Sequence, residues 1–210
     1  MSRKKKFKRI LLCALLISLP LIQSYTEKKN DNIEMAKMCI NNNTVKLDSI
    51  KSKKLYKINQ KDSIKNELID EVERYIFENY PETDKNIPTL IVNHGLEHNV
   101  DILFMMAQTQ QETCYGTLGA GRKSSRRSLF GVAVRRYNNY ENAVADYVKI
   151  LKKSYLTNGR TEQHLLQRYV TSKGSRYAAD RRYEITLKKT YNNISKQTKI
   201  KELQNKYIES

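Results

Sequence analysis

The chain has 210 residues and a formal net charge of +17, from 39 Lys and Arg against 22 Asp and Glu. A balance this basic indicates an anionic partner, which is nucleic acid for a cytosolic protein and wall polymers or a membrane surface for an exported one. No internal repeat is visible in the sequence, which excludes repeat architectures.

Residues 1–24 have the pattern of a secretory signal segment. Six Lys and Arg precede an apolar run of 13 residues, Ile10–Ile22, which is short for a hydrocarbon core about 30 Å thick. Cleavage after Ser24 is the first interpretation, and an uncleaved anchor is the alternative. Either way we expect export to the cell envelope, periplasmic or extracellular. Subtracting six from +17 leaves +11, so anionic wall polymers or a membrane surface are expected partners, and nucleic acid is not.

The next segments predict a linker and two helices. Residues 25–60 are rich in Lys, Asn and Ser without a sustained apolar face, which is typical of a polar flexible linker. Apolar residues at helical spacing predict helices over residues 61–80 and 88–98, and Pro81 ends the first of them.

Residues 102–113 predict a helix that is buried on most sides. Ile102–Ala107 are all apolar, and Asp101 stands before them as an N-cap. The end of this helix is polar, with Gln108 and Glu112 four residues apart on one face. A carboxyl group in a partly apolar site has a raised pKa and can act as a general acid near neutral pH. An ordinary surface glutamate at a helix end is the alternative.

The rest of the chain continues in the same mainly α pattern. A short strand is predicted at residues 132–134, and helices are predicted at 142–153, 160–169 and 183–191. Residues 196–210 read as a basic polar tail with one helical pattern in it.

Four segments of the chain carry a family resemblance. They are AQTQQETCYGT at residues 107–117, SLFGV at 128–132, YNNYENAVADY at 137–147 and SRYAADRRY at 175–183. In this order they resemble AQAxxESGWGT, NLFGI, YxSxxESIxDY and GYATDPxY, motifs of the bacterial glucosaminidase family. This is glycoside hydrolase family 73, the mannosyl-glycoprotein endo-β-N-acetylglucosaminidase-like domain of flagellar muramidases and autolysins.

The resemblance implies a mainly α, lysozyme-like helical domain over residues 61–195, with at most a short β-hairpin. It implies hydrolysis of the β-1,4 bond between N-acetylglucosamine and N-acetylmuramic acid in peptidoglycan glycan strands. Glu112 would be the general acid of a monomeric enzyme that uses no metal and no cofactor. Gln108, Tyr115, Phe130 and Tyr137 would bind substrate, with Tyr115 in the place of the family's Trp.

The sequence departs from the family most clearly in its second catalytic group. Glycoside hydrolysis generally uses two carboxylates, and the hairpin between Gly131 and Tyr137 holds no acidic residue. A water held by Tyr177, or the N-acetyl group of the substrate itself, could take the second role. A lytic transglycosylase and a non-catalytic peptidoglycan-binding module therefore stay open as alternatives. Further departures are Cys114 for Gly, Ser128 for Asn and Arg181 for Pro.

A metal-binding pattern lies outside these motifs. His94-Gly95-Leu96-Glu97-His98 matches H-x-x-E-H, in which two His at helical spacing bind Zn²⁺ and the Glu acts as base. Gly95 weakens the helix, and the sequence identifies no third ligand. Partly exposed helix histidines and no metal are the first interpretation, and a zinc peptidase is a third alternative function.

Overall fold

The structure is a computed structural model that describes residue 34 and residues 54–123, 127–131, 135–180 and 182–210. The chain divides into two units, Met1–Lys57 and Ile58–Ser210, and the second holds nearly all described residues. The expected signal segment lies outside the described residues, as does most of the expected linker, of which residues 54–60 are helical. None of the described helices is both long enough and apolar enough to cross a membrane.

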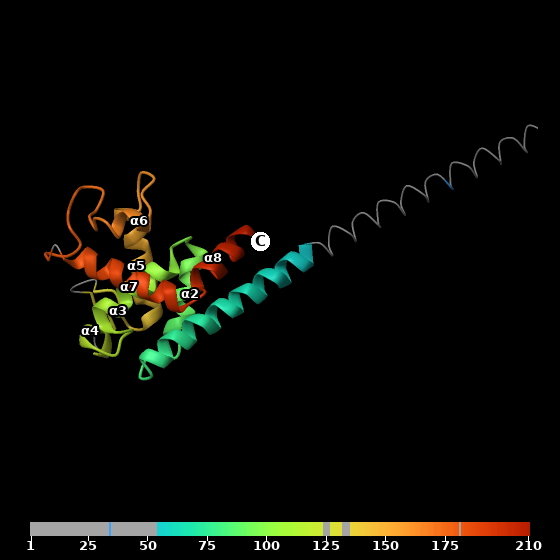
Figure 1. Cartoon of the computed structure of the whole chain (residues 1–210), viewed down its shortest axis with the longest axis horizontal. Helices are drawn as coiled ribbons and strands as arrows, with labels where there is room; N and C mark the ends of the chain where they lie inside the picture. Colours follow the sequence, from blue (N-terminus) through green and yellow to red (C-terminus); the bar gives the residue numbers. More distant parts are fainter. Residues whose placement is uncertain (1–33, 35–53, 124–126, 132–134, 181) are drawn as a thin grey trace, which may run out of the picture. The chain divides into compact units, whose positions relative to one another are not determined.

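The second unit is mainly α, as the sequence predicted. Its described residues form no strand, and their only β-type pairing is an isolated antiparallel bridge between Val170 and Arg176. The strand predicted at residues 132–134 falls outside the described part of the chain. After a helix over residues 58–79, the elements are α2 (Ile87–Glu97), α3 (Ile102–Thr113), α4 (Gly119–Arg122), α5 (Tyr140–Ile150), the π-helical turn η1 (Leu151–Tyr155), α6 (Glu162–Leu165), α7 (Tyr183–Gln197) and α8 (Ile200–Glu209) (Figure 1).

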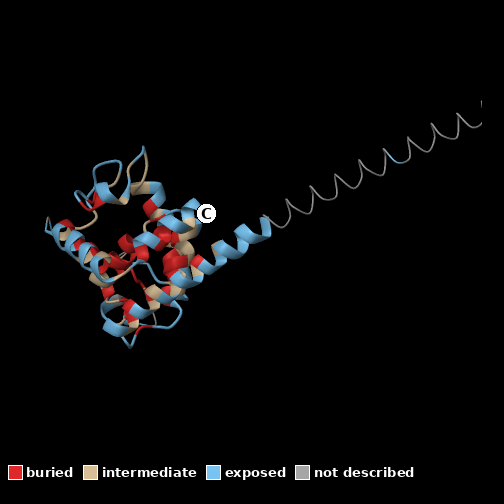
Figure 2. Cartoon of the chain, turned by 45° about the vertical axis from the view of Figure 1, so that its right-hand side comes forward, coloured by how far each residue is buried: buried red, intermediate tan, exposed pale blue. Residues whose placement is uncertain are grey.

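Helix α3 is the centre of this unit. It begins where predicted, because the Asp101 carboxylate accepts a hydrogen bond from the backbone N–H of Phe104 at 3.2 Å. Every residue from Ile102 to Thr109 is buried, and α3 contacts α2, α4, α7 and α8. Figure 2 shows the buried residues gathered in the interior of the unit. The helix ends at Cys114, whose φ of 47° is left-handed, at the position where the resembled motif has Gly.

The helix predicted over residues 160–169 is wrong in length, because α6 ends at Leu165. The backbone N–H of Tyr169 donates to the Glu184 carboxylate at 3.0 Å, and the Arg160 guanidinium donates to the Val170 carbonyl at 2.8 Å. These tertiary hydrogen bonds replace the intrahelical ones, so the chain leaves the helix before Tyr169.

The helical pattern expected near the end of the chain is confirmed as α8, but this helix is not part of an exposed polar tail. Helix α8 buries Ile200 and Leu203 in the core. The buried side chain of Gln204 accepts a hydrogen bond from the Ile102 backbone N–H at 3.0 Å and donates to the Val100 carbonyl at 2.8 Å. Since α8 thereby satisfies free backbone groups at the start of α3, it is part of the folded unit.

Candidate functional site

Glu112 is half-buried on the last turn of α3, and its carboxylate is held from two sides. The Tyr183 hydroxyl donates to Oε1 at 2.6 Å. The backbone of Gly131, in a left-handed conformation with φ of 62°, packs on the other oxygen so closely that a Cβ there would overlap Oε2. Gly131 is therefore required for more than its turn, because any other side chain would displace the carboxylate.

Burial dominates the electrostatics of Glu112. It raises the pKa of the carboxyl group, while the hydrogen bond from the Tyr183 hydroxyl and the neighbouring Tyr177 hydroxyl act in the opposite direction because they favour the carboxylate. Burial also raises the pKa of both phenols, which keeps them protonated as donors. Such a group keeps its proton to a higher pH than an exposed glutamate, can release it to a bound substrate, and remains hydrogen-bonded as the anion.

Tyr177 and Tyr183 belong to a larger tyrosine cluster, which we define as Tyr155, Tyr169, Tyr177 and Tyr183. The rings of Tyr169 and Tyr177 stack with centroids 4.4 Å apart, and those of Tyr177 and Tyr183 are 5.2 Å apart. Tyr155 packs edge-on against Tyr169 at 5.0 Å. The cluster covers the end of α3 with aromatic surface and places two hydroxyls at Glu112.

A cavity of about 210 Å³ borders this site. It is next to Glu112, because it is lined by Gly131, which packs on the carboxylate, and by Tyr177, whose hydroxyl lies 3.0 Å from the Cβ position of Gly131. The π-helical turn η1 contributes to its wall, and such turns are frequent at functional sites. The lining residues are Gly131, Tyr147, Ile150, Leu151, Tyr155, Tyr169 and Tyr177.

Gln108, expected to bind substrate, is fully buried, and that prediction is wrong. Its Oε1 accepts hydrogen bonds from the Tyr147 hydroxyl at 2.7 Å and the Tyr169 hydroxyl at 2.8 Å. Its Nε2 lies 3.5 Å from the Phe130 carbonyl oxygen. Gln108 thus supports the tyrosines and the Phe-Gly turn from inside the core.

Phe130 and Tyr115 are also core residues, so the expectation that their side chains bind substrate is wrong. The Phe130 ring is 1% exposed and stacks on Tyr147 with centroids 3.8 Å apart. Only its carbonyl oxygen reaches the site, where it accepts a hydrogen bond from the Tyr177 hydroxyl. Tyr115 is completely buried, with its ring centroid 5.1 Å from that of Tyr80.

Tyr137 is half-buried and takes part in a different group of side chains. Its hydroxyl donates to the Asp146 carboxylate at 2.7 Å, and Arg135 donates to the same carboxylate. None of these contacts joins Tyr137 to Glu112. Of the residues expected at the site, the structure brings Glu112 and Tyr177 together, and it places Tyr137 elsewhere.

Tyr183 is the residue that sequence reasoning missed. The signal was present, since Tyr183 is the last residue of the segment 175–183 that resembles GYATDPxY. Its role became visible only because α7 starts at this residue, 71 positions after Glu112, and packs on α3.

The carboxylate next to Tyr183 in sequence is already paired. Glu184 is 6% exposed and accepts two hydrogen bonds from the Arg176 guanidinium, at 2.6 and 2.8 Å. It also accepts the Tyr169 backbone N–H. Among the described residues, Glu112 is the carboxylate that accepts a hydrogen bond from the tyrosine cluster, through the Tyr183 hydroxyl.

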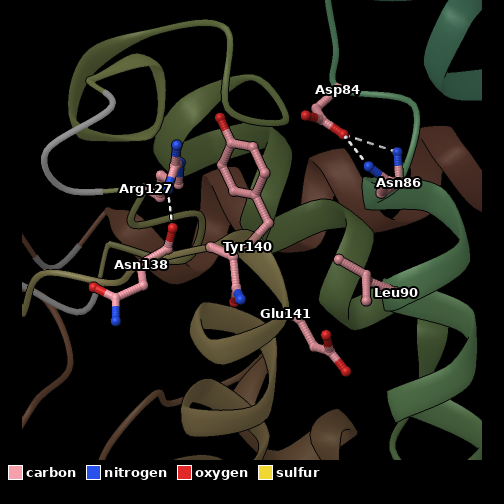
Figure 3. A pocket seen from close by; sticks show the side chains of 8 residues that line it. Asp84, Asn86, Leu90, Arg127, Asn138, Tyr140 and Glu141 are labelled. Atoms are coloured by element: carbon pink, nitrogen blue, oxygen red, sulfur yellow. Dashed lines mark hydrogen bonds between the residues drawn. The ribbon is translucent and has the colours of Figure 1, made fainter.

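Two further features lie away from Glu112. An open pocket of about 520 Å³ is formed between α2 and the start of α5, and Arg127 donates to the Asn138 carbonyl at its edge (Figure 3). The pocket is lined by Asp84, Asn86, Leu90, Arg127, Asn138, Asn139, Tyr140 and Glu141.

The second feature is a group of three side chains at the end of α2. The potential metal-ligand atoms of His94, Glu97 and His98 lie within 4.8 Å of one another.

Comparison of the chain with protein-family models, with curated proteins and with solved structures found no match. The function of the Glu112 site is therefore inferred from its geometry together with the motif resemblance.

Proposed function

We propose that the chain is an exported peptidoglycan hydrolase, an endo-β-N-acetylglucosaminidase of lysozyme-like fold, with Glu112 as general acid. The environment of Glu112 carries the proposal: a half-buried carboxyl group with a raised pKa, hydrogen-bonded to Tyr183 and next to a tyrosine-lined cavity. The order of the four motifs supports the same substrate. The basic balance of the chain suits a polymer that carries carboxylates.

In this mechanism the protonated Glu112 gives its proton to the oxygen of the bond between N-acetylglucosamine and N-acetylmuramic acid. The glycosidic C–O bond breaks as positive charge develops on the sugar ring. The Tyr183 hydroxyl then stabilises the Glu112 carboxylate, and burial favours its reprotonation. In the second half of the reaction, the same carboxylate accepts a proton from the attacking water.

The second catalytic role falls to a group other than a protein carboxylate. In the described part of the chain, no carboxylate besides Glu112 accepts a hydrogen bond from a hydroxyl of the tyrosine cluster. The carbonyl oxygen of the substrate's own acetamido group can stabilise the oxocarbenium ion, as in substrate-assisted glycosidases. Tyr177, whose hydroxyl lies at Glu112 and at the Phe130 carbonyl, is placed to position the water.

The test compares the full chain with two glutamine variants on purified peptidoglycan, with soluble sugars analysed by mass spectrometry. Glu112→Gln removes the proton donor, and we expect it to lower the rate by about 10²–10⁴-fold. Glu162→Gln is the matched control, because burial also raises the pKa of Glu162 but its carboxylate binds the Asp101 backbone instead. Reducing N-acetylglucosamine ends from the wild type and the control alone would support the proposal.

Other products would favour the alternatives. A single acid also serves a lytic transglycosylase, which would leave an anhydro sugar in place of a reducing end. If wild type and Glu112→Gln both sediment with the wall and release nothing, the chain is a binding module. Loss of activity in both variants would argue that Glu112 has no special role.

A further inference from the structure

We propose that His94, Glu97 and His98 form a binding site for a divalent transition-metal ion, with Zn²⁺ as the best fit. His94 is on the last turn of α2 and His98 is its C-cap. Being four residues apart, they share a face of the helix. Their rings are 13° from parallel with centroids 6.0 Å apart, and the three potential ligand atoms lie within 4.8 Å of one another.

The three side chains can close on an ion with small movements. Tetrahedral Zn²⁺ with bonds of roughly 2.0–2.1 Å places its ligand atoms about 3.4 Å apart. The side chains of Glu97 and His98 are exposed, so they can rotate to bring the ligand atoms to this shorter separation. The backbone that carries them is fixed, because Gly95 is buried with its Cβ position 2.6 Å from Ile102 Cγ1 of α3.

A buried polar atom gives an independent sign of a missing partner. Nδ1 of His94 is enclosed and has no hydrogen-bond partner in the structure. Buried polar groups in proteins are nearly always satisfied, and an unsatisfied one commonly marks a bound water or ion. A coordinating imidazole uses one nitrogen for the metal and gives the other to a hydrogen-bond partner.

Two acidic side chains lie near His94. Glu97 and Glu141 are the acidic groups that act on His94, and Glu141 comes from the first turn of α5. Figure 3 shows the Glu141 side chain extending from α5 toward α2. In addition, the site is at the C-terminal end of α2, where the helix dipole stabilises positive charge. Two imidazoles and a carboxylate suit Zn²⁺ better than Mg²⁺ or Ca²⁺, which prefer oxygen ligands alone.

The experiment titrates Zn²⁺ into the full chain with its thiols blocked by N-ethylmaleimide, and follows binding by calorimetry and the melting temperature. His98→Gln and Glu97→Gln each remove one exposed ligand without opening the core. His164→Gln is the matched control, because it removes the remaining histidine of the chain, which instead binds Thr161 in the capping box of α6. The assay does not involve Glu112, so its result is independent of the proposed hydrolase activity.

We expect one Zn²⁺ per chain and a melting temperature that rises with Zn²⁺ concentration. Each ligand variant should bind at least about tenfold more weakly, while His164→Gln should match the wild type. The proposal is overturned if the wild type binds no Zn²⁺, or if His98→Gln and His164→Gln bind it equally well.

Discussion

Replacing Gly131 by Ala tests whether the Phe-Gly turn holds the Glu112 carboxylate. Gly131 has a φ of 62°, and an added Cβ would overlap Oε2 and Cδ of Glu112 and lie 3.0 Å from the Tyr177 hydroxyl. Gly159→Ala is the matched control, since Gly159 has a φ of 74° and nothing within 4 Å of its Cβ position. Both variants acquire the same left-handed alanine, and only Gly131→Ala acquires the collision.

The free energies separate the two effects. A left-handed alanine destabilises a fold by roughly 1–2 kcal/mol, which is the whole effect expected for Gly159→Ala. Overpacking adds roughly 1–3 kcal/mol, so we expect Gly131→Ala to lose about 2–5 kcal/mol of unfolding free energy. The collision cannot be relieved cheaply, because Tyr183 holds the other carboxylate oxygen at 2.6 Å.

Urea unfolding monitored by circular dichroism measures both losses of unfolding free energy. This requires that the transition is two-state and that the dependence of the unfolding free energy on urea concentration is the same in the variants. A Gly131→Ala protein that loses no more stability than Gly159→Ala would refute the close packing of the turn on Glu112. The combined variant Gly131→Ala with Glu112→Ala provides a further check. Removing the carboxylate should recover the part of the loss that comes from the collision.

Four further outcomes are expected. Gln108→Leu should lower the unfolding free energy by about 2–4 kcal/mol in urea titrations, because two buried tyrosine hydroxyls lose their acceptor. Arg176→Ala should cost about 2–3 kcal/mol in the same assay, since Glu184 stays buried without its cation. Cys114→Gly should stabilise the fold by about 0.5–1 kcal/mol and so raise the melting temperature, because the backbone φ at this position is 47°. The raised pKa of Glu112 makes stability depend on pH. The stabilising contribution of Glu112 is complete below the ordinary glutamate pKa and is lost as the pH rises through its pKa in the folded state. The unfolding free energy measured from pH 4 to 8 should therefore fall for the wild type relative to Glu112→Gln.

The sequence alone determined the start of the helix that has a strong apolar pattern and a capping residue. α3 begins where predicted because its apolar run and its Asp101 cap are both local features. The position of Glu112 at the end of a buried helix follows from the same features. Where the pattern was weak, as in residues 160–169, tertiary hydrogen bonds decided the structure instead.

Tertiary structure alone decided which polar side chains face the site. Helical spacing places Gln108 and Glu112 on one face, yet Gln108 is buried beneath two tyrosines and Glu112 is half-exposed. Tyr115 was expected to face substrate and lies in the core, while Tyr183 reaches Glu112 from another helix. Periodicity states which residues share a face, but the element that covers that face comes from distant sequence, so burial and hydrogen-bond partners are set only when the helices pack.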